Sequence, residues 1–142
     1  MGELGTVVGA HDELCQCTIL VIDDDDDVRD VYISALKLMG FRRFLEARNG
    51  VEGIKVYVEH IDEIRLIILD LDMPEMNGAA FFHELLKINQ GHERKAKVLL
   101  STGRCDCPVV ERLLQEGLDM AISKPPQLEV MRKDICELMG SR

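Results

Sequence analysis

The sequence predicts an α/β fold in which a parallel sheet of five strands lies between layers of helices. Two observations lead to this fold class. Short apolar runs of strand length alternate five times with segments whose apolar residues recur at helical spacing. The chain also has 142 residues, 46% of them hydrophobic, which is enough for one domain with a substantial core. We therefore expect one domain over residues 18–140, preceded by a flexible tail over residues 1–17.

Five apolar runs are the expected strands. The central one spans residues 64–70 and is rich in aliphatic and β-branched side chains, which is typical of a strand buried on both faces of a parallel sheet. The segment over residues 42–47 is less apolar and is expected nearer an edge of the sheet. The remaining strands are expected over residues 18–23, 98–102 and 119–124.

Segments with helical periodicity follow these runs. In the first, apolar residues recur from Val28 to Met39, and Gly40 follows as the C-terminal cap. The acidic residues Asp25, Asp26 and Asp27 are interpreted as capping and solvating the N-terminus of this helix, which favours negative charge. The later helices are expected over residues 50–61, 79–88, 108–116 and 128–139.

Acidic residues close two of the strands. Asp70 ends the central run, so its carboxylate is expected at the carboxyl edge of the sheet, where open α/β folds bind ligands. One such Asp alone would be interpreted as a turn residue. Asp23 and Asp24 close the first run in the same way, which brings three carboxylates to one edge. Like charges this close repel unless a cation joins them, and Mg²⁺ fits best because it prefers oxygen ligands.

Two later strands end in hydrogen-bond donors. The fourth apolar run leads into Ser101 and Thr102, and the fifth ends at Lys124, before two prolines. A hydroxyl and an ammonium group at the same edge of the sheet are suited to phosphoryl oxygens.

Taken in order, the residues that close these strands resemble the receiver domain of two-component response regulators, of the single-domain chemotaxis type. The resemblance covers residues 18–140 and implies a flavodoxin-like (βα)5 three-layer sandwich with strand order 2-1-3-4-5. The motifs that carry it are Asp23-Asp24, Asp70 followed by Met73-Pro74 and Gly78, Thr102-Gly103, and Lys124-Pro125.

The resemblance implies a phosphoacceptor signalling domain rather than an enzyme, one that promotes its own phosphorylation and autodephosphorylation. Asp70 would accept a phosphoryl group from a sensor histidine kinase or a histidine phosphotransfer protein. The other implied roles are Mg²⁺ binding by Asp23, Asp24, Asp70 and the backbone carbonyl of Asp72, contact with phosphoryl oxygens by Thr102 and Lys124, and a cis Lys124–Pro125 bond.

A conformational change would then alter contacts with a downstream protein target. The expected surface is the face formed by the fourth helix, the fifth strand and the last helix. Ala121 stands where the family has an aromatic residue that swings inward, so a switch of that kind cannot operate through this residue. Pro126 replaces a usual Phe and stiffens the start of the last helix, and Asn77 replaces a frequent Asp.

Asp72 and Arg104 occupy the two positions that, in the family, flank the water that attacks the phosphoryl group. Our hypothesis is that they pair as a lid that alters autodephosphorylation. The alternative is a pair of solvated charges worth less than about 1 kcal/mol.

Composition argues against several partners. The formal charge of −9 and the pI near 4.9 disfavour direct binding of nucleic acid, which requires Lys and Arg to neutralise phosphates. No apolar segment reaches the length of a membrane span, and the N-terminus has no basic region followed by an apolar stretch. We therefore expect a cytoplasmic protein that binds no membrane and is a monomer or a weak dimer.

The cysteines and histidines have less specific patterns. Five cysteines are an odd count without an export signal, so reduced thiols are expected. Two Cys-x-Cys pairs could hold zinc, although structural zinc sites usually have wider spacing. The histidines show no ligand spacing and are interpreted as surface residues. The residues concerned are Cys15, Cys17, Cys105, Cys107 and Cys136, and His11, His60, His83 and His92.

Two alternatives remain at this point. Asp70-Leu71-Asp72 also resembles the nucleophile motif of haloacid-dehalogenase-type phosphatases, but those enzymes carry their acidic metal pair downstream of it, and here the pair lies upstream. A degenerate receiver that serves only as a docking scaffold is the second alternative, and the presence of every acceptor-site residue argues against it.

Overall fold

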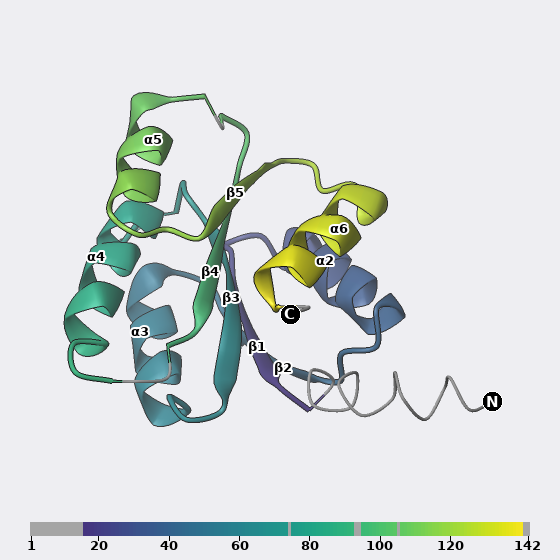
Figure 1. Cartoon of the computed structure of the whole chain (residues 1–142), viewed down its shortest axis with the longest axis horizontal. Coiled ribbons are helices and arrows are strands. Elements are labelled where there is room, and N and C mark those ends of the chain that lie inside the picture. Colours follow the sequence, from purple (N-terminus) through teal and green to yellow (C-terminus); the bar gives the residue numbers. More distant parts are fainter. Residues whose placement is uncertain (1–15, 74, 93–94, 105, 141–142) are drawn as a thin grey trace.

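The computed structural model describes residues 16–140 except 74, 93–94 and 105 (Figure 1). Five strands and five helices alternate along this part of the chain. The strands are β1 (Thr18–Ile22), β2 (Arg43–Ala47), β3 (Ile64–Asp70), β4 (Lys97–Thr102) and β5 (Met120–Ser123). The helices are α2 (Asp26–Leu38), α3 (Gly50–Glu59), α4 (Gly78–Ile88), α5 (Pro108–Gln115) and α6 (Leu128–Leu138).

The strands form one parallel sheet in the order β2-β1-β3-β4-β5. Helices α2 and α6 cover one face of the sheet, and α3, α4 and α5 cover the other (Figure 1). Both the fold class and the strand order implied by the resemblance are therefore confirmed. The less apolar second strand lies at an edge, as its composition predicts.

Local capping explains where the helices begin. The Asp25 carboxylate accepts hydrogen bonds from the backbone N–H groups of Asp27 and Val28, so the capping interpretation of this residue is confirmed. Asn49 caps α3 and Asn77 caps α4 in the same way, each through a side-chain oxygen. Asn77 thus starts a helix and lies outside the polar cluster described below.

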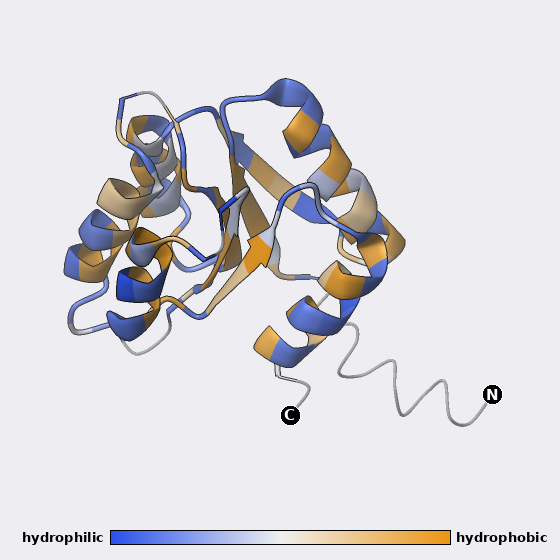
Figure 2. Ribbon diagram, turned by 90° about the horizontal axis from the view of Figure 1, so that it is seen from above, coloured by the Kyte–Doolittle hydropathy of each residue, from blue (hydrophilic) through white to orange (hydrophobic). Residues whose placement is uncertain are grey.

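The alternation of side chains along the strands divides the core in two. Ile19, Val21 and Ile68 face α2 and α6, where they pack with Tyr32 and Leu36 among others. Their neighbours in sequence, such as Leu20 and Leu69, face the larger core under α3, α4 and α5. Figure 2 shows apolar residues along the strands, between the two helical layers.

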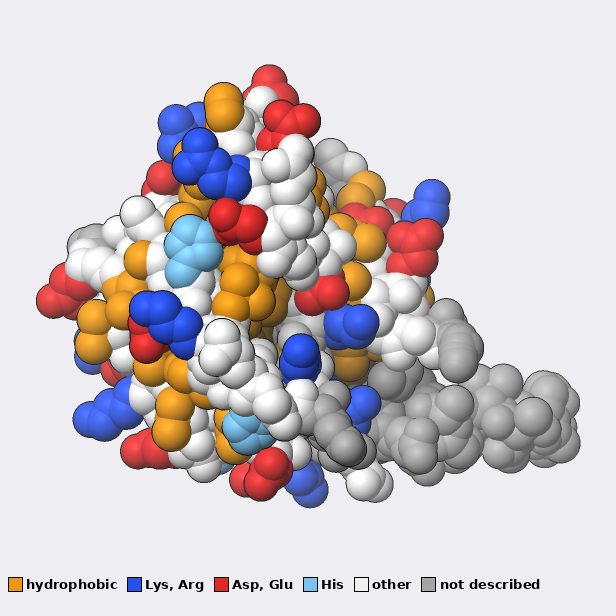
Figure 3. Space-filling model, turned by 60° about the vertical axis from the view of Figure 1, so that its left-hand side comes forward, with side chains coloured by type: hydrophobic (Ala, Val, Ile, Leu, Met, Phe, Trp, Pro, Cys, Tyr) orange, Lys and Arg blue, Asp and Glu red, His pale blue; other side chains and the backbone are white. Residues whose placement is uncertain are grey.

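The surface over the α3, α4 and α5 side carries acidic and basic side chains interspersed with apolar ones (Figure 3). Within the described residues, no helix combines the length and apolar character needed to cross a membrane. Cys15, Cys105 and His11 lie outside the described residues, as does the expected tail apart from Gln16 and Cys17. The zinc hypothesis and the tail boundary therefore stay predictions.

Candidate functional site

On one face of the sheet, the side chains of four strands change from apolar to polar at the carboxyl edge. Two residues after a core residue of the α2 and α6 side, each strand presents a group that can bind an ion or donate a hydrogen bond. Because the strands are parallel neighbours, these groups converge. The four steps are Val21 to Asp23, Ile68 to Asp70, Leu99 to Ser101 and Ile122 to Lys124.

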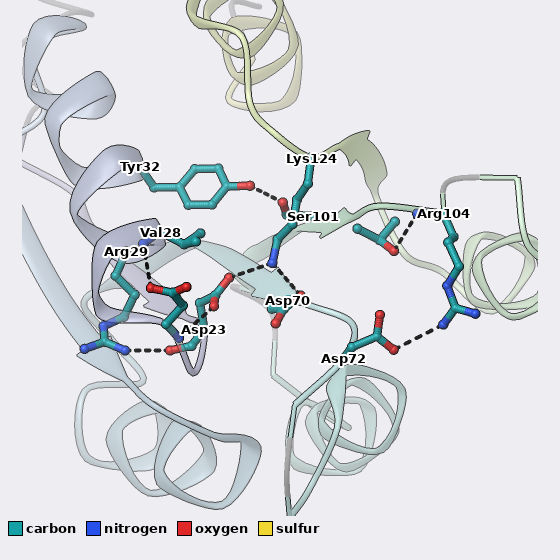
Figure 4. Close-up of polar contacts among 11 residues, drawn as sticks. Asp23, Val28, Arg29, Tyr32, Asp70, Asp72, Ser101, Arg104 and Lys124 are labelled. Carbon is teal, nitrogen blue, oxygen red and sulfur yellow. Dashed lines mark hydrogen bonds and ion pairs between the residues drawn. The ribbon is translucent and has the colours of Figure 1, made fainter.

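Lys124 joins the two buried carboxylates. Its Nζ atom lies 2.9 Å from Asp70 Oδ1 and 3.0 Å from Asp23 Oδ2 (Figure 4). Asp23 and Asp70 are 1% and 4% exposed, so water screens these contacts little. Asp24 is exposed, and one carboxylate oxygen each from Asp23, Asp24 and Asp70 lies within 4.8 Å of the other two.

The charges of this cluster do not balance. Burial raises the pKa of Asp70 to about 6, and the charge of Asp23 adds to the rise, while the hydrogen bond from Lys124 opposes it. Burial lowers the pKa of Lys124, but the two carboxylates outweigh this and raise it to about 12. One ammonium thus faces three carboxylates, and the site retains an excess of negative charge.

A hard divalent cation fits this excess. The three carboxylates offer oxygen ligands within one small volume, and Mg²⁺ is usually held by one or two carboxylates together with water and phosphate oxygens. The donor chemistry of this edge therefore agrees with the metal expected from the sequence.

A buried arginine holds the backbone of the acidic loop. Arg29 is 7% exposed, and its Nη1 atom donates to the carbonyl of Asp23 at 2.6 Å. The same guanidinium pairs with Glu46 of β2 and with Asp26. Sequence reasoning missed Arg29, although it shares the buried face of α2 with Tyr32, three residues on, and this spacing was a signal that could have found it.

Thr102 lies at the end of β4 but alternates to the other face of the sheet, since Leu100 two residues before it packs in the larger core. Thr102 is 1% exposed. Its hydroxyl oxygen accepts a hydrogen bond from the backbone N–H of Arg104 at 3.1 Å. Thr102 therefore approaches the edge from the side opposite to Lys124. The Lys124–Pro125 bond is cis, as the resemblance implies.

Asp72 and Arg104 pair across the mouth of the site. Arg104 Nη2 lies 3.2 Å from Asp72 Oδ1, and both side chains are about two-thirds exposed (Figure 4). The loop that carries Asp72 packs closely on the sheet, because a Cβ atom at Gly78 would lie 2.4 Å from the carbonyl oxygen of Asp70. The pairing that the sequence suggested is therefore present.

Ala121 is partly buried in β5 and borders a cleft of about 400 Å³ with Pro125 and Val130. Val130 of α6 is 46% exposed on the rim. The short side chain of Ala121 borders this opening and does not fill it.

Comparison with known proteins assigns this arrangement to a family. The sequence profile of the response regulator receiver domain matches residues 19–136. The chain therefore belongs to the response regulator receiver domain family, whose members are signalling domains of two-component systems. The family assignment that the sequence motifs suggested is confirmed.

Individual relatives agree with this assignment. A probable chemotaxis protein CheY from Rhizobium etli is 29% identical over 123 residues, which cover 87% of this chain and 92% of that protein. Other relatives are longer: the chain covers 32% of a cyclic di-GMP phosphodiesterase from Thermotoga maritima.

Solved structures show the same fold. The CheX–CheY–BeF3–Mg complex from Borrelia burgdorferi matches with a TM-score of 0.80 at 20% identity, over 88% of this chain and 90% of that chain. The complex of the phosphotransfer protein Ypd1 with the receiver domain of Ssk1 from Saccharomyces cerevisiae matches with a TM-score of 0.77 at 18% identity, covering 88% and 90% of the two chains.

Proposed function

We propose that Asp70 is the phosphoacceptor of this receiver domain. The observation that carries the proposal is the position of its carboxylate: it is buried, at the carboxyl end of the central strand, and hydrogen-bonded to Lys124 beside two further carboxylates. Phosphoryl transfer requires mainly positioning and neutralisation of charge, and this edge supplies both.

The phosphoryl group would pass directly from a histidine of the donor protein to Asp70. An oxygen of the Asp70 carboxylate forms a bond to phosphorus, while the bond from phosphorus to a histidine nitrogen of the donor breaks and its electron pair returns to that nitrogen. Lys124 neutralises negative charge on the phosphoryl oxygens. Thr102 approaches the same position from the opposite face of the sheet and donates its hydroxyl hydrogen to another phosphoryl oxygen.

Asp23, Asp24 and Asp70 would hold Mg²⁺, together with the backbone carbonyl of Asp72. When bound, the metal supplies positive charge that offsets the charge of the incoming phosphoryl group. Arg29 contributes by fixing the backbone of Asp23, so that this carboxylate stays directed toward Asp70.

The donor and the output are proteins in this proposal. A sensor histidine kinase or a histidine phosphotransfer protein presents the phosphoryl group, as the complexed receiver of Ssk1 suggests, and a cytoplasmic location follows from such a donor. The output surface is the face formed by α5, β5 and α6, where the cleft beside Ala121 opens. Phosphorylation alters the contacts of a target protein there.

The test is phosphorylation of the whole chain by acetyl phosphate with Mg²⁺, followed by intact mass measurement. Wild-type protein should gain one phosphoryl group, and Asp70→Asn should gain none. Asp62→Asn is the matched control, since it changes an exposed carboxylate just before β3, at the opposite end of this strand from Asp70. Equal labelling of Asp70→Asn and wild type would contradict the proposal.

A haloacid-dehalogenase-type phosphatase is the second candidate, based on Asp70-Leu71-Asp72. It predicts repeated turnover of p-nitrophenyl phosphate, whereas a receiver predicts labelling in proportion to protein. The exposed, Arg104-paired position of Asp72 favours the receiver, because a general acid would need to face the substrate.

A further inference from the structure

The start of α3 is bonded to the loop between β3 and α4. The backbone N–H of Gly50, the first residue of α3, donates to the Met76 carbonyl at 3.0 Å. Asn49 caps α3 through its side-chain oxygen, and the amide nitrogen of the same side chain donates to Glu75 Oε1 at 3.0 Å. Two successive residues at the start of α3 therefore hold two successive residues of the loop.

Gly50 lies closer to the loop than a residue with a side chain could. A Cβ atom at this position would lie 2.3 Å from the Met76 carbonyl oxygen and 2.7 Å from the Met76 Cβ atom. Because the nearest atom belongs to the backbone, a change of side-chain rotamer could not relieve the contact. Any other residue at position 50 would require the backbone of α3 or of the loop to shift.

The loop should move more easily than the helix. On α3, Tyr57 is fully buried in the larger core, and Gly53 packs against Ile22 and Phe81. In the loop, by contrast, the side chain next to Met76 is that of the exposed Glu75. A methyl group at position 50 would therefore displace Met76 before it displaced α3.

A displaced Met76 would disturb the backbone of Asp70. Two residues after Met76, the Gly78 N–H donates to the Leu71 carbonyl at 2.9 Å. A Cβ atom at Gly78 would lie 2.4 Å from the Asp70 carbonyl oxygen, so these two backbones are also in close contact. Only two peptide units thus separate the residue held by Gly50 from the residue that packs on Asp70.

The loop also contacts the carboxylate of Asp70 directly. The backbone N–H of Asp72 donates a hydrogen bond to this carboxylate. The carbonyl of the same residue is one of the groups proposed above to hold Mg²⁺. The position of the loop therefore determines where two backbone groups lie relative to the proposed phosphoacceptor.

We propose that Gly50 is a positioning residue for Asp70 and for the magnesium site proposed above. Its lack of a side chain allows the start of α3 to hold Met76, and Met76 fixes the loop whose backbone contacts Asp70. Gly50 acts through this loop and takes no part in the transfer itself. The inference rests on the proposed function, since it concerns metal binding and phosphorylation at Asp70.

The experiment compares two alanine substitutions on the same helix. Gly50→Ala places a methyl group against the Met76 carbonyl. Gly53→Ala is the matched control, because a Cβ atom there would lie 2.7 Å from Ile22 Cδ1 and 3.1 Å from the Phe81 ring, both of which are side-chain atoms of the core. Both changes crowd α3 and should lower its stability, but only Gly50→Ala should disturb the site.

The first readout is Mg²⁺ affinity, which does not depend on phosphorylation. Calorimetric titration of the unphosphorylated chain with Mg²⁺ should show about tenfold weaker binding for Gly50→Ala, as expected when a group that orients metal ligands is lost. Gly53→Ala should stay within about twofold of wild type. At saturating Mg²⁺, labelling by acetyl phosphate should still be slower in Gly50→Ala, because Asp70 itself is displaced.

Asn49→Ser tests the same contact if Gly50→Ala does not fold. A serine can still cap α3, but it lacks the amide group that donates to Glu75. Its Mg²⁺ affinity should fall by a smaller factor than that expected for Gly50→Ala. Wild-type affinity in Asn49→Ser would then overturn the inference.

Wild-type Mg²⁺ affinity in a folded Gly50→Ala variant would also overturn it, as would equal losses of affinity in Gly50→Ala and Gly53→Ala. If the wild-type chain shows no Asp70-dependent labelling, the proposed function itself fails. Normal labelling of the wild-type chain together with an unaffected Gly50→Ala variant overturns the inference alone.

Discussion

The two faces of the sheet use the same strands differently. Under α3, α4 and α5 the side chains stay apolar almost to the carboxyl edge, as in Leu69 and Leu71 of the central strand region. On the face covered by α2 and α6, the apolar side chains end before the carboxyl edge of the sheet. Asp23, Asp70 and Lys124 occupy the next positions on that face. The face under α3, α4 and α5 thus stabilises the fold by excluding water. The face under α2 and α6 carries charged side chains at its carboxyl edge.

The difference shows how a rigid core can support a charged site. Each charged residue follows a buried aliphatic residue by two positions, so its backbone is fixed by the hydrogen bonds of the sheet and by packing. The charges are therefore held close together although they repel. The two faces should therefore respond differently to mutation, to Mg²⁺ and to pH.

The largest effect is expected for Lys124→Met. Removing the single ammonium leaves Asp23 and Asp70 buried without a cation, and breaking a buried ion pair costs about 3 to 5 kcal/mol of unfolding free energy. Urea unfolding at about pH 8 in EDTA should show this loss. Added Mg²⁺ should restore more stability to the variant than it adds to wild type, because the metal binds the same carboxylates.

Leu100→Ala is the control on the apolar face. It should cost about 3 kcal/mol through the cavity that it leaves, and Mg²⁺ should not restore that loss beyond its effect on wild type. Equal responses of the two variants to Mg²⁺ would mean that the faces do not differ in the way proposed.

A smaller effect is expected from pH. Asp70 has a pKa of about 6 in the folded protein against an ordinary value of 3.8. Because the folded state binds this proton more tightly than the unfolded chain does, the contribution to stability is fully present below about pH 4 and is lost as the pH rises through about 6. In EDTA, Asp70→Asn should gain about 2 kcal/mol relative to wild type between about pH 4 and pH 7.

Urea unfolding of both proteins over this pH range checks the prediction. Asp72→Asn, at an exposed position, serves as the reference and should follow the wild-type curve. Parallel curves for Asp70→Asn and wild type would rule out a buried carboxyl with a raised pKa as the source of the effect.

The smallest change in stability is expected at the mouth of the site. Asp72→Ala and Arg104→Ala should each alter the unfolding free energy by less than about 1 kcal/mol, because the pair is solvated. If the pair acts as a lid, the phosphorylated form of either variant should lose its phosphoryl group severalfold faster, since water reaches it more easily.

The decay of labelled protein, followed by intact mass, measures this rate. Arg48→Ala is the matched control, because Arg48 forms a comparable surface pair with Glu52 at 3.7 Å on α3. An unchanged decay rate in the double variant Asp72→Ala/Arg104→Ala would leave the pair as two solvated charges.

Much of the fold was predictable because hydrophobic periodicity reports burial directly. The segment that became β3 reads as a doubly buried strand from its aliphatic residues, and Asp25, Asn49 and Asn77 belong to the residue types that cap helices. The strand order was different: alternation of strands and helices allows several orders, and only the family motifs implied the observed one.

The site was predictable where a charge interrupts an apolar run, as at Asp70. Arg29 and Tyr32 could not be placed by that rule, since a helix permits polar and aromatic residues on any face until its neighbours are known. The hydroxyl of Tyr32 is hydrogen-bonded to that of Ser101, which lies 69 residues away in the sequence. Ser101 was visible only as a polar residue at the end of an aliphatic run, which is also how a strand ends.

The ammonium of Lys124 has one last implication. Lying between two carboxylates, it acts as a built-in counterion that is covalently part of the protein. In the metal-free protein, the negative charge of the acidic cluster is therefore already partly neutralised by Lys124.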